Sequence, residues 1–387
     1  MAGFAGALRA LGAEVRVCAP PDFADLLARV GVPLVPAGQS VREMVRRVFT
    51  GKTPPSAADL AAGVIAGRAD AVAGAAEGCD VLVAAGLTTA AAGAQAVSEE
   101  RGIRYMYAAY APCYLPSPHF PPLSLHGQPV PPDVTDNRVL WDLHAQGMNA
   151  VFGAPVNAYR ASLGLPAVDN VRDYVSTDHP WLAADPTLAP WPEPADFNVV
   201  QTGAWILPDE RPLPAELEAF LDVGLPPVYL GFGSMRAPAD VARVAIEAIR
   251  GQGHRALVAR GWADLALIDD KDDCFAVGEV NQQALFGRVA AVVHHGGAGT
   301  TTTATRAGVP QVVVPQWADQ PYFASRVADL GIGAAHDVQA PTTESLSAAL
   351  STALTPQTRA RARAVAGTIS TDGATVAAKL LLERVSG

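Results

Sequence analysis

The sequence of 387 residues is poor in charged, aromatic and cysteine residues. Charged residues make up 17% of it and aromatic residues 6%, while half of it is hydrophobic, which is typical of a well-buried globular enzyme and not of a disordered chain. No apolar run reaches the roughly 18–20 residues that span a membrane. No secretory signal is visible at the start either, so we expect a cytoplasmic protein without a transmembrane segment.

Positive charge is also scarce. Lys and Arg number 28 against 38 Asp and Glu, which gives a net charge of −10 and argues against nucleic acid as a partner. Four cysteines lie far apart without a C-x-x-C pair, at Cys18, Cys79, Cys113 and Cys274. We expect reduced thiols there, and neither a zinc site nor a disulfide framework. The adjacent His294 and His295 would point to opposite faces of a strand, where they cannot easily share a metal ion.

Short apolar runs rich in β-branched residues alternate with helical patterns along the chain. Because these runs lack strict alternation, they fit parallel strands buried on both faces. The chain length favours two domains. We therefore expect an α/β fold of two Rossmann-like, doubly wound parallel-sheet domains that face each other across a cleft. The strand candidates are 14–20, 32–38, 79–86, 103–112, 226–234, 254–261, 274–280, 290–297 and 310–316, and the helical patterns include 21–31, 239–253, 320–331 and 343–354.

Two proline-rich stretches interrupt this alternation. Residues 111–136 also hold aromatic residues and show no regular period, which favours a binding loop or lid. Residues 181–214 fit a linker between the domains. The predicted limits are an N-terminal domain over 1–200, a linker over 201–215, a C-terminal domain over 216–370, and a helix over 371–387 that packs back on the N-terminal domain.

The first residues are unusual for such a fold. Phe4, Leu8 and Leu11 recur at helical spacing, Gly12 fits a helix C-cap, and the strand pattern begins near Val15. An α/β domain usually opens on a strand that supplies the centre of its sheet. We therefore expect the first strand of the N-terminal domain to be missing from this chain.

The richest motif is the sequence HHGGAGTTTT, residues 294–303. A strand would end at the two histidines, the glycines would form a turn, and the threonines would open a helix whose N-terminus favours an anion. Gly297 and Gly299 lack the third glycine of a dinucleotide fingerprint. From the glycines alone, phosphate binding and a tight packing turn both stay open.

The longer stretch HHGGAGTTTTATRAGVPQVVVPQWADQPYFASRV resembles the donor-binding signature of nucleotide-sugar glycosyltransferases with the two-domain GT-B fold. The segments VQTGAWILPDERPLPAELEAFLDVG, VYLGFGS, RGWADL and CFAVGEVN are similar to family 1 enzymes that glycosylate vancomycin- and teicoplanin-type glycopeptide antibiotics. VRVCAPP, YLPSPHFPP and VTDNRVLW extend the resemblance to the first half. It therefore covers essentially the whole chain.

The resemblance implies an inverting hexosyltransferase that needs neither a metal nor another cofactor. Its donor would be a nucleoside-diphosphate sugar, with UDP-glucose or UDP-N-acetylglucosamine favoured. Its acceptor would be a hydroxyl, expected to be a phenol, of a glycopeptide aglycone, and the protein would be a monomer or weak dimer. A sterol, lipid or macrolide glycosyltransferase of the same fold is the alternative, as is a catalytically impaired nucleotide-sugar-binding protein.

Carried over residue by residue, the resemblance places the donor site in the second domain. The expected diphosphate-binding residues are Ser234, His295, Gly297, Ala298, Gly299, Thr300 and Thr301. Val280 and Asn281 lie in the base-binding segment, where plant members have a stacking tryptophan. Because that tryptophan is lacking here, the choice between UDP and TDP stays open. Thr303 stands where many members have a ribose-binding glutamate, which is another departure.

The resemblance also implies that Asp319 and Gln320 hold the hydroxyls of the donor sugar and that Asp319 assists catalysis. From the residues alone, Asp319 equally fits a helix N-cap. The long proline-rich loop would line the acceptor groove, although ordinary loop packing is the alternative. The residues concerned are Tyr110, Tyr114, His119 and Phe120.

The general base of the relatives is an aspartate in a glycine-rich loop between the first strand and the first helix. This chain begins like the helix that follows that loop, so about fifteen residues, enough for a strand and its turn, are expected upstream of Met1. We predict that the encoding DNA, read upstream in frame, continues with this strand and a loop containing Gly and Asp. Asp178 and Asp185 could substitute for the base, but their proline-rich setting favours loop caps.

Overall fold

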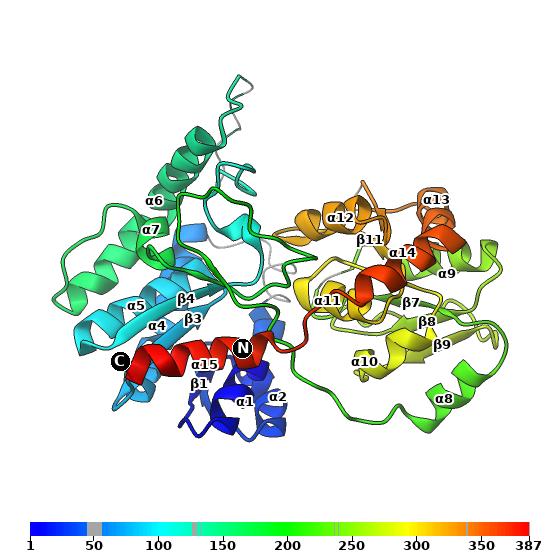
Figure 1. The fold of residues 1–387 in the computed structure, drawn as a ribbon, viewed down its shortest axis with the longest axis horizontal. Coiled ribbons are helices and arrows are strands. Elements are labelled where there is room, and N and C mark those ends of the chain that lie inside the picture. The colour runs from blue at the N-terminus through cyan, green and yellow to red at the C-terminus, as the bar shows by residue number, and fades with distance from the viewer. Residues whose placement is uncertain are drawn as a thin grey trace. The chain divides into compact units, whose positions relative to one another are not determined.

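The computed structural model describes residues 1–44, 56–125, 129, 131, 133–235, 237–238, 240–337 and 340–386 (Figure 1). It divides into two compact units. Unit 1 comprises Met1–Ala184, Pro190–Leu207 and Thr371–Gly387, and unit 2 comprises Asp185–Ala189 and Pro208–Ser370. The predicted linker over 201–215 thus contains one of the points where the chain passes from unit 1 to unit 2.

The described strands of unit 1 form two parallel sheets. In the first, β1 (Val17–Ala19) pairs with β2 (Leu34–Pro36). The second has the order β3–β4–β5–β6. Its strands are β3 (Val81–Ala85), β4 (Arg104–Ala109), β5 (Trp181–Leu182) and β6 (Val200–Gln201). The four strand candidates of the first half are confirmed, since each contains one of β1 to β4.

β5 and β6 lie inside the proline-rich stretch 181–214, where the sequence predicts a linker. That interpretation is wrong for the beginning of the stretch. Both strands have two residues, too few to show a period, and they exist because each pairs with a neighbour in the sheet. In the described part of the loop 111–136, the regular structure before the next helix is one short turn, η2 (Pro112–Tyr114).

The helix predicted at the start of the chain is confirmed. Phe4 and Leu8 of α1 (Ala2–Ala10) are buried with the small residues of α15 (Gly373–Ser386), and the two helices lie side by side (Figure 1). Gly12, just beyond the helix, has the left-handed φ of 91° expected of a C-cap residue. The remaining described helices of unit 1 are η1 (Pro21–Phe23), α2 (Ala24–Arg29), α4 (Ala57–Ala76), α5 (Thr88–Arg101), α6 (Asn137–Ser162) and α7 (Val171–Ser176).

Unit 2 is built on one parallel sheet with the strand order β12–β11–β10–β7–β8–β9. The strands are β7 (Val228–Gly231), β8 (Ala256–Ala259), β9 (Cys274–Val277), β10 (Ala291–His294), β11 (Gln311–Val313) and β12 (Gly333–Ala335). The five strand candidates of the second half are confirmed. The sequence does not predict β12, whose Gly-Ala-Ala has no strand pattern of its own.

Two hydrophobic clusters cover the two faces of this sheet. Val228 and Leu230 pack on one face with α9 and α13, while Tyr229 between them packs on the other with α8 and α10. Figure 1 shows the strands between these helices. The helices are α8 (Ala215–Asp222), α9 (Val241–Gly251), α10 (Gln282–Leu285), η3 (Phe286–Arg288), α11 (Ala298–Arg306), α12 (Gln320–Asp329), α13 (Thr343–Ala353) and α14 (Pro356–Ala366).

In the part of the chain that the structure describes, no helix is long and apolar enough to cross a membrane.

Candidate functional site

The strand order of unit 2 changes direction between β7 and β10. The chain runs outward from β7 through β8 to β9, then returns to place β10 on the other side of β7. In open parallel sheets, ligands bind beyond the carboxyl ends of the strands at such a switch point. Ser234 follows β7 and is exposed, and His295 directly follows β10. The structure therefore brings these two predicted diphosphate ligands to the same edge of the sheet.

His295 lies tightly against the glycine turn. Its side chain is 8% exposed, and its Nδ1 is buried without a hydrogen-bond partner among the described residues. A Cβ added to Gly297 would lie 2.5 Å from Nε2, so the backbone must be bare at this position for the ring to fit. Burial lowers the pKa of His295 to about 4. The ring is consequently neutral at pH 7, with a single N–H to donate.

Helix α11 begins directly beside this ring. Gly297 is its N-cap, and no side chain caps the helix. The first N–H groups of an α-helix have no partner within it and carry the positive end of its dipole. Thr300 in the first turn is half-buried, and its hydroxyl has no partner within the described structure. Ala298, Gly299 and Thr300 thus present donors suited to an anion.

The other threonines of the helix use their hydroxyl hydrogens internally. Thr301 is fully buried and donates to the carbonyl oxygen of Gly297 at 2.9 Å. Thr303 is half-buried and donates to the carbonyl oxygen of Gly299, also at 2.9 Å. The predicted diphosphate ligand Thr301 and ribose ligand Thr303 therefore direct their hydrogens to the backbone of the preceding turn.

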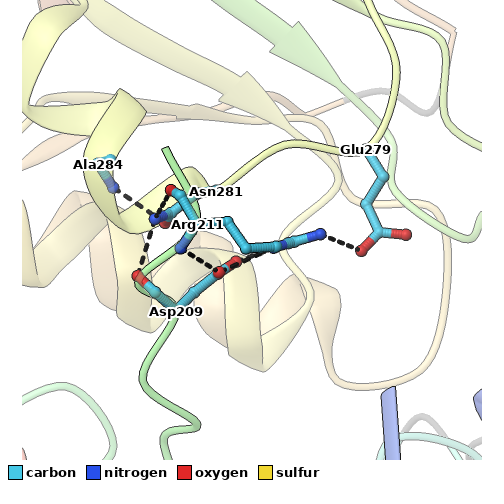
Figure 2. A network of polar contacts seen from close by, with 5 residues as sticks. All are labelled: Asp209, Arg211, Glu279, Asn281 and Ala284. Atoms are coloured by element: carbon cyan, nitrogen blue, oxygen red, sulfur yellow. Dashed lines mark hydrogen bonds and ion pairs between the residues drawn. The ribbon is translucent and has the colours of Figure 1, made fainter. Parts of the chain in front are cut away.

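The predicted base-binding segment is held by Asn281 (Figure 2). Its side chain is buried, and its Oδ1 accepts from the Ala284 backbone N–H, which caps α10. Its Nδ2 donates to the carbonyl oxygens of Asp209 and Arg211 at 2.7 and 2.8 Å. Both amide hydrogens are thus engaged. The neighbouring Val280 is half-buried against the hydrophobic core on this face of the sheet.

An ion-pair network continues from Asn281 (Figure 2). Arg211 donates through Nε and Nη2 to the Asp209 carboxylate at 2.8 and 2.6 Å, and through Nη1 to Glu279 at 3.4 Å. The linker residues 209–211 are therefore bound to the loop between β9 and α10. The sequence does not predict this attachment, because Asp209 and Arg211 lie about 70 residues before their partners and resemble any charged residues of a proline-rich linker.

The predicted sugar-binding pair lies at the start of α12. Asp319 occupies the N-cap position, but its side chain makes no capping hydrogen bond, so the N-cap role that the residues also suggested is not present. Gln320 is 3% exposed, and its Oε1 accepts from the backbone N–H groups of Gln316 and Trp317 at 2.7 and 3.2 Å. The Gln320 amide oxygen therefore stabilises the loop that precedes α12.

Trp317 connects this loop to the segment that carries Ser234. Its Nε1 lies 3.4 Å from Met235 Sδ, and 58% of the residue is exposed. No pattern in the sequence singled out Trp317. The signal available in the sequence was its place two residues before Asp319, inside the stretch that carries the family resemblance.

The predicted acceptor residues all belong to unit 1. The Tyr110 ring packs edge-on against Trp205, and Phe120 packs edge-on against Trp191. His119 is exposed and its Nε2 lies 2.8 Å from the carbonyl oxygen of Pro194, whereas Tyr114 is 40% exposed. Three of the four side chains thus pack on the segment 191–205 of the same unit.

Asp185 is a loop cap, as its proline-rich setting predicted. It is buried, and its Oδ1 accepts from the N–H groups of Thr187 and Leu188 at 2.8 and 3.1 Å. Its Oδ2 accepts from the Ser370 N–H at 2.8 Å. Asp185, which is 1% exposed, thus holds three backbone N–H groups, as a loop cap does. Asp178 is exposed.

The sequence profile described as "Erythromycin biosynthesis protein CIII-like, C-terminal domain" matches residues 263–377. Glycosyltransferase GtfE and vancomycin aglycone glucosyltransferase, both from Amycolatopsis orientalis, are 59% and 57% identical over 378 and 382 residues. Each comparison covers 98% of this chain and 92% of that protein. The dTDP-epi-vancosaminyltransferase of the same organism is 51% identical over 392 residues, which is 100% of this chain and 94% of that protein.

Solved structures share the fold at low sequence identity. Spinosyn forosaminyltransferase SpnP superposes with a TM-score of 0.70 at 19% identity, covering 100% of this chain and 95% of that one. Glycosyltransferase VinC, in complex with DTDP, gives 0.68 at 20% identity, with 100% and 96% covered. The resemblance found in the sequence is confirmed. This chain is a hexosyltransferase that belongs to the family of vancomycin-type glycopeptide antibiotic glycosyltransferases, and its fold is GT-B.

Proposed function

We propose that this enzyme transfers a hexose from UDP-glucose or UDP-N-acetylglucosamine to a phenol hydroxyl of a glycopeptide aglycone, with inversion at the anomeric carbon. The observation that carries the donor half is the uncapped N-terminus of α11 beside the neutral His295. This group of donors suits a diphosphate. The 57% identity to vancomycin aglycone glucosyltransferase supports glucose as the sugar and an aglycone as the acceptor.

In the proposed reaction, negative charge builds on the departing diphosphate while the anomeric carbon becomes oxocarbenium-like. The N–H groups of Ala298, Gly299 and Thr300 would stabilise this charge without rearranging, because the helix already orients them. We expect the ring proton of His295 to be on Nε2, since Nδ1 is buried. The Nε2–H group would then donate a hydrogen bond to a phosphate oxygen. No step of this proposal uses a metal.

Asp319 and Gln320 are the proposed sugar ligands. The Asp319 carboxylate would accept from two sugar hydroxyls. Because Oε1 of Gln320 already accepts two backbone hydrogen bonds, its amide NH₂ is the group that we expect to donate to the sugar. We propose that the segment around Val280 contacts the base, and that Asn281 orients this segment because its own amide hydrogens are engaged.

Calorimetry tests the donor half of the proposal. We expect the purified protein to bind UDP and dTDP, with the tighter of the two identifying the base. The dTDP-epi-vancosaminyltransferase relative makes dTDP the main competitor. Absence of binding for both nucleotides would overturn the proposed donor site.

A transfer assay tests the acceptor half. UDP-glucose and vancomycin aglycone should yield a product heavier by one hexose, with a β-linkage by NMR and an unchanged rate in EDTA. Transfer to a sterol or macrolide but to no glycopeptide aglycone would contradict the proposed acceptor. Nucleotide binding without transfer to any of them would show an impaired enzyme.

A further inference from the structure

A chain of buried hydrogen bonds lies behind the diphosphate site, and it starts at His294. This residue ends β10 and is 0% exposed. Its Nδ1 accepts from the Gly296 backbone N–H at 3.1 Å, and its Nε2 lies 3.0 Å from Gln311 Oε1 on the neighbouring strand β11. Because Nδ1 accepts, the ring proton must be on Nε2, where it meets an acceptor.

The chain continues from β11 into α11. Gln311 Nε2 donates to Thr305 Oγ1 at 3.0 Å, and the Thr305 hydroxyl donates to the carbonyl oxygen of Thr301 at 2.8 Å. Gln311 and Thr305 are at most 1% exposed. The chain therefore begins at the glycine turn and ends inside the helix that the turn introduces.

We infer that His294 is a positioning residue, which, with Gln311 and Thr305, holds the Gly296 turn so that α11 and His295 present their donors to the diphosphate. The inference rests on the proposed function. It assigns His294 a role different from that of the neighbouring His295, although the sequence shows two adjacent identical residues.

The geometry of the turn explains why it needs such support. Gly296 has a left-handed φ of 92°, and a Cβ there would lie 2.7 Å from Val313 Cγ1. Its N–H is buried at the start of the turn, and without the His294 acceptor it would have no partner in the described structure. An unsatisfied buried N–H is costly, so the turn would move to find one. Gly297, the helix N-cap, is the next residue and would move with it.

The neutral form of His294 is required for this role. Burial lowers the pKa of His294 to about 3, with a smaller contribution from the nearby His295. Gln311 on β11, its hydrogen-bond partner, and Thr305 on α11, which accepts from Gln311, are uncharged, and His295 is the titratable group whose charge acts on it. A proton on Nδ1 would face the Gly296 N–H and break the contact.

Two substitutions of His294 separate positioning from general stability. Asn places its Oδ1 where Nδ1 stands, so His294→Asn can still accept from Gly296. His294→Gln places its amide near the Nε2 position and leaves the Gly296 N–H without that acceptor. His336→Phe is the matched control, because it removes a buried histidine contact, to Ser345 at 2.9 Å, elsewhere in unit 2.

The readouts are the dissociation constants of UDP and dTDP and the unfolding temperature of each folded variant. We expect His294→Gln to weaken nucleotide binding by about 10-fold or more, and His294→Asn by about 3-fold or less. His336→Phe should lower the unfolding temperature without changing the affinity. Equal affinities of His294→Gln and wild type, or equal losses in the Asn and Gln variants, would overturn the inference. A wild-type protein that binds neither nucleotide would overturn the proposed function instead.

Discussion

Gly297 and Asn281 act on the arrangement of neighbouring residues. Gly297 must lack a side chain because the His295 ring fills the space that a Cβ would take. Asn281 uses both amide hydrogens and its oxygen to join two backbone segments. Each residue lies in a segment expected to contact the donor nucleotide. A small change at either position should therefore alter binding through its neighbours.

Gly297→Ala should displace His295 from its place under the turn. We expect the dissociation constant of UDP or dTDP to rise about 10- to 100-fold, the value of one hydrogen bond to a charged group. Gly251→Ala at the end of α9 is the control, because nothing lies within 4 Å of the added Cβ. Isothermal titration calorimetry on both variants measures the difference. Unchanged affinity in Gly297→Ala would show that the close approach is unimportant.

Asn281→Asp should separate the linker from the base-binding segment. The new carboxylate still accepts from Ala284, but it faces the carbonyl oxygens of Asp209 and Arg211 and cannot donate to them. We expect unit 2 to lose about 2–3 kcal/mol of unfolding free energy in urea titrations. Asn137→Asp, which removes one donor from Pro118 in unit 1, should affect unit 2 far less. Equal effects of the two variants would contradict this account.

In the segment from β10 to α11, a strand, a turn and a helix together form the proposed diphosphate-binding element. The helix AGTTTTATR contains few strong helix formers, so its stability depends on packing and on threonine hydroxyls that donate to backbone carbonyls. The strand ends at the buried His294, and the buried His295 directly follows it. The pKa values of His294 and His295 are lowered to about 3 and 4. Both rings therefore stay neutral near pH 6.5, where an exposed histidine takes up a proton.

These two histidines make the stability of unit 2 depend on pH. The unfolded state binds protons below about pH 6.5 while the folded rings stay neutral, so stability is lost as the pH falls toward 4. At pH 5 we expect each histidine to cost about 2 kcal/mol relative to pH 7.5. Urea titrations of wild type and His294→Asn at both pH values test this. The variant should lose about 2 kcal/mol less, and an identical loss would refute the assignment.

The two units of the whole chain each have their own hydrophobic clusters, although the chain passes between them at 184/185, 189/190, 207/208 and 370/371. The candidate donor site is built within unit 2, and the predicted acceptor residues lie within unit 1. A nucleotide without its sugar should therefore act on one unit. At the scale of the whole molecule, we expect nucleotide binding to stabilise unit 2 and to leave the stability of unit 1 unchanged.

Saturating nucleotide, at 100 times its dissociation constant, should stabilise unit 2 by about 2.7 kcal/mol. For a unit of this size, the corresponding unfolding transition should rise by about 5–10 °C in calorimetry. Hydrogen exchange should slow in the segment from β10 to α11 and in the loop after β9. Exchange in β3 and β4 should not change. Slower exchange confined to unit 1 would contradict a nucleotide site in unit 2.

Local patterns in the sequence sufficed to predict the alternation of strands and helices, the strands β1 to β4 and β7 to β11, and the glycine turn before α11. These features depend on residues close together in the chain, whose side-chain period reflects burial directly. Residues 294–327, which include this glycine turn, also carried the family resemblance. The strands β5 and β6 could not be predicted from the sequence, because two residues are too few to show a period. These strands form because each pairs with a neighbouring strand.

The proposed roles of His294 and Asn281 rest on contacts between residues distant in sequence. Nε2 of His294 contacts Gln311 on another strand, and Nδ2 of Asn281 donates to a linker segment about 70 residues earlier. A hydrogen bond is directional and works over about 3 Å, so its partners are known only when the chain is folded. The amino-acid order thus determined which elements form and to which family they belong. Only the tertiary structure showed that His294 accepts from the Gly296 N–H and meets Gln311, while Nδ1 of His295 has no partner among the described residues, because these contacts depend on which buried atoms each ring meets.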